Sequence, residues 1–173
     1  MNKVYLIGNG YVCNFITDKH SDDFEFIGVC RSKKNNCKIN HSLDISTCTN
    51  QLKEVFQEEG NVVYLAAPPP AGVEDLTLNH FLSHIDKTKI NKIIYISTSG
   101  VYGDKKDQLV TEESELNPLT DRAKRRVDAE GQIIKSNIKF TILRVPGIYG
   151  KSRLPLKRIA DNLPLIKKDI CKH

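Results

Sequence analysis

The chain has 173 residues, of which 39% are hydrophobic and 27% charged, and its formal net charge is +5. This length and composition predict one folded domain, residues 1–173, with a core of ordinary size, and they argue against a disordered chain. No apolar run approaches the roughly 20 residues that span a bilayer, and the first residues do not form a signal peptide. We therefore expect a cytoplasmic protein that does not associate with membranes.

Charge and composition also narrow the ligands. The positive charge favours anionic groups such as phosphates, but only 7% of residues are aromatic and tryptophan is absent, so we expect no nucleic-acid partner. The five cysteines include no CxxC pair, which predicts reduced thiols rather than disulfides or metal ligands. His80 and His84 share a helix face without a third ligand, and we predict no metal site.

The N-terminal segment carries a specific motif. A strand-like stretch, residues 3–7, leads into Gly8-Asn9-Gly10-Tyr11-Val12-Cys13, and a helical pattern follows. In this context Gly8 permits a tight turn, and Gly10 lets the backbone approach a pyrophosphate. The N–H groups at the start of the helix, with Tyr11 and Val12, point at that phosphate. The motif normally ends with a third glycine, where this chain has Cys13, so it is degraded but sits in the structural context that it requires.

Strand and helix patterns then alternate to the end of the chain. Apolar runs predict strands, and apolar residues at helical spacing predict helices between them. We expect strands at 24–30, 39–43, 61–67, 92–97 and 139–145, and helices at 46–59, with Ser46 as its cap, 75–87 and 120–136. A helix between every pair of strands implies right-handed crossovers and a Rossmann-like doubly wound parallel α/β sheet.

The end of the second strand indicates the type of cofactor. In NAD-binding units an acidic residue about 20 residues after the glycines accepts hydrogen bonds from the ribose hydroxyls. This chain has Arg31, Ser32 and Lys33 there instead, which suit the 2′-phosphate of NADP. A solvated basic loop is the alternative. We expect NADP as the preferred cofactor, with NAD as the second choice.

Several segments together resemble a known family. They are the glycine loop, Leu43-Asp44-Ile45, Ser97-Thr98-Ser99-Gly100-Val101-Tyr102-Gly103, and Leu143-Arg144-Val145-Pro146-Gly147-Ile148-Tyr149-Gly150. The chain is similar to the NAD(P)-dependent epimerase/dehydratase group of the extended and atypical short-chain dehydrogenases/reductases. The resemblance covers essentially the whole chain, and the combination of segments is far more specific than any one of them.

The resemblance implies roles for individual residues. Thr98 matches the residue that hydrogen-bonds the substrate oxygen, and Tyr102 is an alternative proton donor. The segment from Arg144 to Gly150 is similar to the one that passes near the nicotinamide and the substrate. The cofactor-binding residues that the motifs and the resemblance imply are Gly8, Gly10, Tyr11, Val12, Arg31, Ser32, Lys33, Asp44, Ile45, Ala66, Ala67, Pro68, Arg126 and Pro146.

Two features depart from the family pattern. The family's acid–base pair is a tyrosine followed four residues later by a lysine, and these positions hold Arg122 and Arg126. Arg126 can replace the lysine as a ribose clamp, whereas the guanidinium of Arg122 stays protonated and cannot replace the tyrosine. Family members also continue into a substrate domain of roughly 100 residues or more, a usual domain size. We therefore expect that the chain is truncated at its C-terminus and that much of the substrate site is missing.

Three functional interpretations remain open. The first is oxidoreductase or epimerase chemistry on a small sugar or nucleotide-sugar substrate. The second is a catalytically inactive NADP-binding regulator, or a remnant of a longer enzyme. A module that assembles with a separately encoded C-terminal lobe is a third option, and apolar surface left uncovered could drive homodimerisation.

Overall fold

A computed structural model describes residues 2–32, 36–151 and 153–154. A six-stranded parallel sheet with the strand order β3-β2-β1-β4-β5-β6 forms its centre. The strands are β1 (Asn2–Ile7), β2 (Phe24–Cys30), β3 (Ile39–Ser42), β4 (Gly60–Tyr64), β5 (Ile90–Thr98) and β6 (Phe140–Val145). The α-helices are α1 (Tyr11–His20), α2 (Asn50–Val55), α3 (Leu76–His84) and α4 (Asp121–Ile134). In these ranges no helix has both the length and the apolarity needed to cross a membrane.

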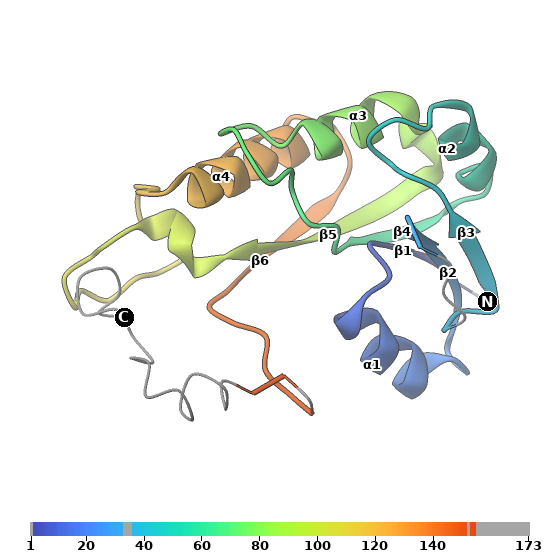
Figure 1. Ribbon diagram of the computed structural model, residues 1–173, viewed down its shortest axis with the longest axis horizontal. Coiled ribbons are helices and arrows are strands. Elements are labelled where there is room, and N and C mark those ends of the chain that lie inside the picture. Colours follow the sequence, from blue (N-terminus) through green and yellow to red (C-terminus); the bar gives the residue numbers. More distant parts are fainter. Residues whose placement is uncertain (1, 33–35, 152, 155–173) are drawn as a thin grey trace.

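Helices lie on both faces of the sheet. Figure 1 shows α2, α3 and α4 along one face and α1 on the other. The larger core fills the first interface, where Tyr5, Tyr64 and Tyr95 of the sheet are buried with Phe56 and Phe81. A smaller core beneath α1 contains Val4, Leu6, Cys13 and Phe26. Neighbouring residues of β1 and β2 thus point into different cores, which explains why residues 4–7 of β1 and 26–29 of β2 are buried without a break.

The strand order creates one special position in the sheet. From β1 the chain moves outward to β2 and β3, and from β4 it moves the opposite way to β5 and β6. Because β1 and β4 are neighbours, the loops that leave their carboxyl ends diverge and leave a crevice between them. The glycine loop follows β1, so the fold brings it to this crevice.

The doubly wound parallel fold predicted from the sequence is confirmed, with element boundaries shifted by at most four residues. One connection was predicted wrongly. A helix was expected between every pair of strands, yet residues 31–32 and 36–38, between β2 and β3, contain none. A crossover helix needs a longer connection than the eight residues between Cys30 and Ile39. The connection can be short because Ile39 pairs with Ile27, halfway along β2.

The start of α2 also differs from the prediction. Ser46 was expected to cap a helix over 46–59, but α2 covers only Asn50–Val55 and follows Thr49. The Ser46 hydroxyl instead donates to Asp44 Oδ1 at 2.6 Å, and the Ser46 backbone N–H donates to the same oxygen at 2.9 Å. Serine and aspartate form such local turns in competition with helix capping.

A buried ion pair joins α4 to β6. Arg144 Nη2 donates to Glu130 Oε2 at 2.7 Å, and Arg144 Nε lies 3.2 Å from both carboxylate oxygens. The Ser97 hydroxyl donates to Glu130 Oε1 at 2.5 Å, so β5 takes part as well. Glu130 is 2% exposed. Its hydrogen bonds raise the pKa of Arg144, which keeps the guanidinium charged.

We predict that Glu130→Ala lowers the free energy of unfolding by about 3–5 kcal/mol, because it leaves the Arg144 cation without its buried partner. The control is Lys124→Ala, which removes an ion pair between half-exposed side chains, with Lys124 Nζ 3.7 Å from Asp121 Oδ1. That change should cost less than about 0.5 kcal/mol. Urea unfolding of the three proteins measures the difference. Equal small losses in both variants would contradict this account of the ion pair.

Candidate functional site

The glycine loop packs tightly against the end of β4. Gly8 has a φ of +86°, and a Cβ there would lie 2.5 Å from the Ala66 backbone nitrogen and 2.8 Å from the Leu65 carbonyl carbon. Such distances exclude every side chain. Hydrogen bonds hold both sides of the contact, from Gly8 N–H to the Val29 carbonyl at 2.9 Å and from Leu65 N–H to the Ile7 carbonyl at 2.7 Å. Gly8 therefore serves close packing between the two strand ends.

Gly10 lies in different surroundings. A Cβ there would meet nothing closer than the Gly8 carbonyl oxygen at 3.7 Å. Gly10 is the N-cap of α1 and supplies no capping side chain, and the first turn of the helix contains no acidic residue. The positive end of the helix dipole is therefore not neutralised locally by an acidic side chain, a setting that suits an anion.

Cys13 fills the position of the third glycine without disrupting the loop. The side chain is fully buried in the core beneath α1, and its Sγ lies 3.7 Å from the Gly8 carbonyl oxygen. Burial raises the pKa of this thiol to about 11. Cys13 thus acts as a small apolar residue that packs the helix against β1 and β2.

A groove of about 610 Å³ opens at the carboxyl ends of β1 to β4. It contains most of the cofactor-binding residues that were predicted from the sequence. Those that line it are Gly8, Gly10, Arg31, Ser32, Asp44, Ile45, Ala66, Ala67 and Pro68. The structure therefore brings together residues from four separate strand ends, as expected at the switch point of an open sheet.

Two side chains of opposite charge, Arg31 after β2 and Asp44 after β3, line one part of the groove. Arg31 and Ser32 are exposed there, and the Ser42 hydroxyl donates to the Arg31 carbonyl at 3.0 Å. The hydrogen bonds from Ser46 lower the pKa of Asp44, and Arg31 lowers it further. Asp44 is consequently a carboxylate at neutral pH that can accept hydrogen bonds from a ligand.

Other predicted residues do not line this groove. Tyr11 and Val12 belong to the first turn of α1, and the Tyr11 hydroxyl donates to the Lys151 carbonyl at 2.9 Å. Pro146 is exposed just after β6. Lys33 lies outside the described residues. The contact of Tyr11 brings the segment after β6 to the start of α1.

Arg122 and Arg126, at the positions of the expected acid–base pair, differ in their surroundings. Arg126 Nη1 donates to the Tyr95 hydroxyl at 2.8 Å and to the Ile96 carbonyl at 3.2 Å. Its guanidinium carbon also lies 5.6 Å from the centroid of the Tyr95 ring. Burial raises the pKa of Tyr95 to about 12, so this phenol stays neutral. Arg122 is exposed one turn earlier on α4.

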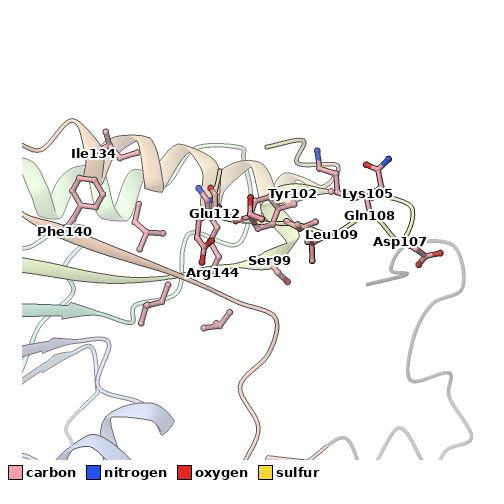
Figure 2. A pocket seen from close by; sticks show the side chains of 16 residues that line it. Ser99, Tyr102, Lys105, Asp107, Gln108, Leu109, Glu112, Ile134, Phe140 and Arg144 are labelled. Carbon is pink, nitrogen blue, oxygen red and sulfur yellow. Dashed lines mark hydrogen bonds between the residues drawn. The ribbon is translucent and has the colours of Figure 1, made fainter. Parts of the chain in front are cut away.

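A second groove, of about 1050 Å³, contains Tyr102. In Figure 2, Ile134 and Phe140 lie toward one end of this groove and Lys105, Gln108 and Asp107 toward the other. The Tyr102 hydroxyl accepts from Arg144 Nη1 at 2.8 Å, which ties it to the ion pair of β6 and α4. Thr98 lies just before this region, and its Oγ1 accepts from the Gly100 N–H at 3.2 Å.

In the sequence, Asn9 is only the spacer between two glycines. In the structure Asn9 is 3% exposed, lines the 610 Å³ groove and hydrogen-bonds Asn36 and Asn40. The proline run after β4 contributes Pro69 and Pro70 beyond the predicted Pro68. The prolines could have been found from their place at a strand end, whereas nothing periodic in the sequence marks the asparagines.

Comparisons with known proteins agree with the fold described above. The RmlD substrate binding domain family matches residues 81–160, and no curated protein sequence matches the chain. Among solved structures, UDP-glucuronic acid 4-epimerase from Bacillus cereus, in complex with NAD, aligns with a TM-score of 0.75 and 21% identity over 94% of this chain. The chain has the fold of the nucleotide-sugar epimerases. The resemblance to the epimerase/dehydratase group is thereby confirmed at the level of the fold.

Two further structures agree. UDP-glucose 4-epimerase from Thermotoga maritima, with UDP-glucose, aligns with a TM-score of 0.71 and 22% identity over 90% of this chain. The UDP-Glc/GlcNAc 4-epimerase from Campylobacter jejuni aligns with a TM-score of 0.71 and 18% identity over 93%. This chain spans 65% of the Bacillus protein, 58% of the Thermotoga protein and 62% of the Campylobacter protein.

The two glycines of the loop should respond differently to a methyl group. We predict that Gly8→Ala lowers the free energy of unfolding by at least about 1–3 kcal/mol. The added methyl group meets the Ala66 backbone, and alanine would have to adopt the positive φ of this position. Gly10→Ala meets no close atom, so its cost should be only that of a poorer N-cap, about 0.5–1 kcal/mol. Thermal unfolding of both variants checks the contrast, and equal stability of the two would contradict it.

Proposed function

We propose that the chain binds NADP(H), and NAD(H) more weakly, in the 610 Å³ groove. The observation that carries the proposal is the pairing of Gly8, packed on the end of β4, with Gly10, which has no neighbour in tight contact at the start of α1. A pyrophosphate fits beside Gly10, where backbone N–H groups and the helix dipole favour negative charge. Asp44 and Ile45 at the end of β3, and Ala66 to Pro68 after β4, supply the walls for the adenosine half.

The preference for NADP(H) rests on the end of β2. Arg31 and Ser32 line the groove where NAD-binding units have a carboxylate. A guanidinium and a hydroxyl form charge-assisted hydrogen bonds with a phosphate. Asp44, after β3, carries the opposite charge, and it would face the adenine side of the ligand rather than the phosphate.

We further propose that the chain is the cofactor-binding part of an oxidoreductase or epimerase that acts on a nucleotide-sugar-like substrate. The solved structures with this fold include 4-epimerases in complex with NAD and with UDP-sugars. A bound nicotinamide would supply hydride transfer. Thr98 would hold the substrate oxygen, since a hydroxyl that accepts from the Gly100 N–H can still donate.

A second candidate function, cofactor binding without catalysis, is favoured by the contacts of Arg126. Its guanidinium is engaged by the Tyr95 hydroxyl and the Ile96 carbonyl. Arg122 is exposed, and a guanidinium is not a general acid or base for a substrate. The Tyr102 hydroxyl is bound to Arg144, which supports a structural role. On this reading the chain senses or carries NADP(H).

Charge reversal at Arg31 tests the cofactor preference. We expect NADPH to bind the wild type at least 10-fold more tightly than NADH, and Arg31→Glu to abolish this preference through repulsion of the 2′-phosphate. Lys139→Glu is the matched control, because it makes the same charge change just before β6, at the opposite edge of the sheet. Fluorescence titration measures both dissociation constants. An unchanged NADPH preference in Arg31→Glu would rule out the assigned role.

The two candidate functions predict different results for Arg126→Ala. If Arg126 is structural, the variant loses about 1–3 kcal/mol of stability, since the buried Tyr95 hydroxyl loses its partner, while the dissociation constant for NADPH stays within twofold. Arg122→Ala, an exposed arginine on the same helix, should change neither quantity. A 10-fold weaker NADPH affinity without a loss of stability would instead support the ribose clamp.

A further inference from the structure

One exposed leucine lines the 610 Å³ groove. Leu76, the first residue of α3, is 64% exposed. Among the described residues, the other large aliphatic side chains that line the groove are buried or half-buried: Val29, Leu43, Ile45 and Leu65. Single exposed leucines are common on protein surfaces, so exposure alone assigns no role to Leu76. In a concave groove, however, the free surface of an apolar side chain is available to a ligand.

Side chains of α4 hold the backbone just before Leu76. Asp75 is fully buried, and its backbone N–H donates to Asp128 Oδ2 at 2.7 Å. Gln132 Nε2 donates to the Asp75 carbonyl at 3.2 Å and to Asp128 Oδ2 at 2.7 Å. Asp128 and Gln132 lie one turn apart on α4, so this helix binds both backbone groups of Asp75. The first residue of α3 therefore has a fixed place at the groove.

Two more contacts order the same segment. Asp75 Oδ1 accepts from the Leu78 N–H at 3.0 Å and so caps α3. Arg125, which is 7% exposed, donates from Nη1 to the Gly72 carbonyl. A ligand contact on a segment that is already ordered costs less conformational entropy on binding.

The face of α3 that carries Leu76 is turned toward the end of β3. His80 lies one turn after Leu76, and its Nδ1 donates to the Ile45 carbonyl at 2.9 Å. Residues four apart share a helix face, so Leu76 lies on the side of α3 that meets the segment of Asp44 and Ile45. Asp44 and Ile45 are proposed walls for the adenosine half of the ligand. Leu76 is thus placed for the base rather than for the nicotinamide.

We propose that the flat base of the bound nucleotide packs on the Leu76 side chain, and that Asp128 positions Leu76 through the backbone of Asp75. This inference rests on the proposed binding of NADP(H). The contact removes apolar surface of both the ring and the leucine from water. NADPH and NADH carry the same base, so the contact adds affinity for both and does not contribute to the preference between them.

Leu76→Ala tests the contact. Calorimetric titration should show that NADPH, NADH and ADP-ribose all bind more weakly by the same factor, roughly 5–10-fold. ADP-ribose contains the base and the pyrophosphate but no nicotinamide. Because Leu76 is exposed in the free chain, the melting temperature should stay within about 2 °C of the wild type. Leu119→Ala is the matched control, since Leu119 is 58% exposed and lines neither groove, and it should leave all three dissociation constants unchanged.

Two substitutions at Asp128 test its positioning role. Asp128→Ala leaves the Asp75 N–H without its acceptor and should weaken ADP-ribose binding roughly threefold or more. Asp128→Asn keeps a side-chain oxygen that accepts from the same N–H, so its affinity should stay within about twofold of the wild type. If Asp128 acts through Leu76, then Asp128→Ala has no further effect on ADP-ribose binding in a Leu76→Ala background.

The outcomes separate this inference from the proposed function. If the wild type binds the three ligands and Leu76→Ala binds them equally well, the contact is refuted while cofactor binding stands. Weaker NADPH binding with unchanged ADP-ribose binding would place Leu76 beside the nicotinamide and overturn the inference as well. A full effect of Asp128→Ala in the Leu76→Ala background would refute the positioning role. If the wild type binds none of the ligands, the proposed cofactor binding fails, and this inference fails with it.

Discussion

The arrangement of the groove depends on the packing of Gly8 against the backbone of Ala66, where a Cβ at Gly8 would lie 2.5 Å from the Ala66 nitrogen. β1 and β4 are neighbours in the sheet, but their loops leave in opposite directions. The absence of a side chain at Gly8 lets the two loops touch at their base, so that they diverge above it. The crevice between them holds Gly10 on one side and Ala67 on the other. This packing sets the width of the groove at the carboxyl ends of the strands.

Buried charged and polar side chains stabilise the second half of the domain. Glu130 and Arg144 form a buried ion pair that also holds the Tyr102 hydroxyl, and Arg126 is bound to Tyr95. These contacts stabilise the packing of α4 on β5 and β6. The groove lined by Gly8, Gly10 and Asp44 is open, whereas the guanidinium groups of Arg126 and Arg144 are already bound to protein groups. This contrast is why cofactor binding is the better supported part of the proposed function.

The sequence was sufficient for the fold and for most of the groove. Apolar strands ending in small, polar or proline residues place Gly8, Asp44 and Ala67 at one sheet edge, because parallel strands share their carboxyl ends. The amide pair of Asn9 and Asn36 could not be predicted, since these residues lie 27 positions apart without any periodic signal. The hydrogen-bond partners of Arg126 could not be predicted either. It depends on a tyrosine of another element, and a helical pattern fixes the face of a residue but not its partner. Ser46 was misassigned because serine caps helices and closes turns by the same hydrogen bond.

The most direct test of this account is calorimetric titration of the wild-type chain with NADPH. The account predicts one bound molecule per chain, and at 100 times the dissociation constant a gain of roughly 2.7 kcal/mol in the free energy of unfolding. Absence of binding at millimolar NADPH, with the chain folded, would contradict it. The packed Gly8 and open Gly10 would then be features of the fold that this chain retains without the ligand for which they are suited.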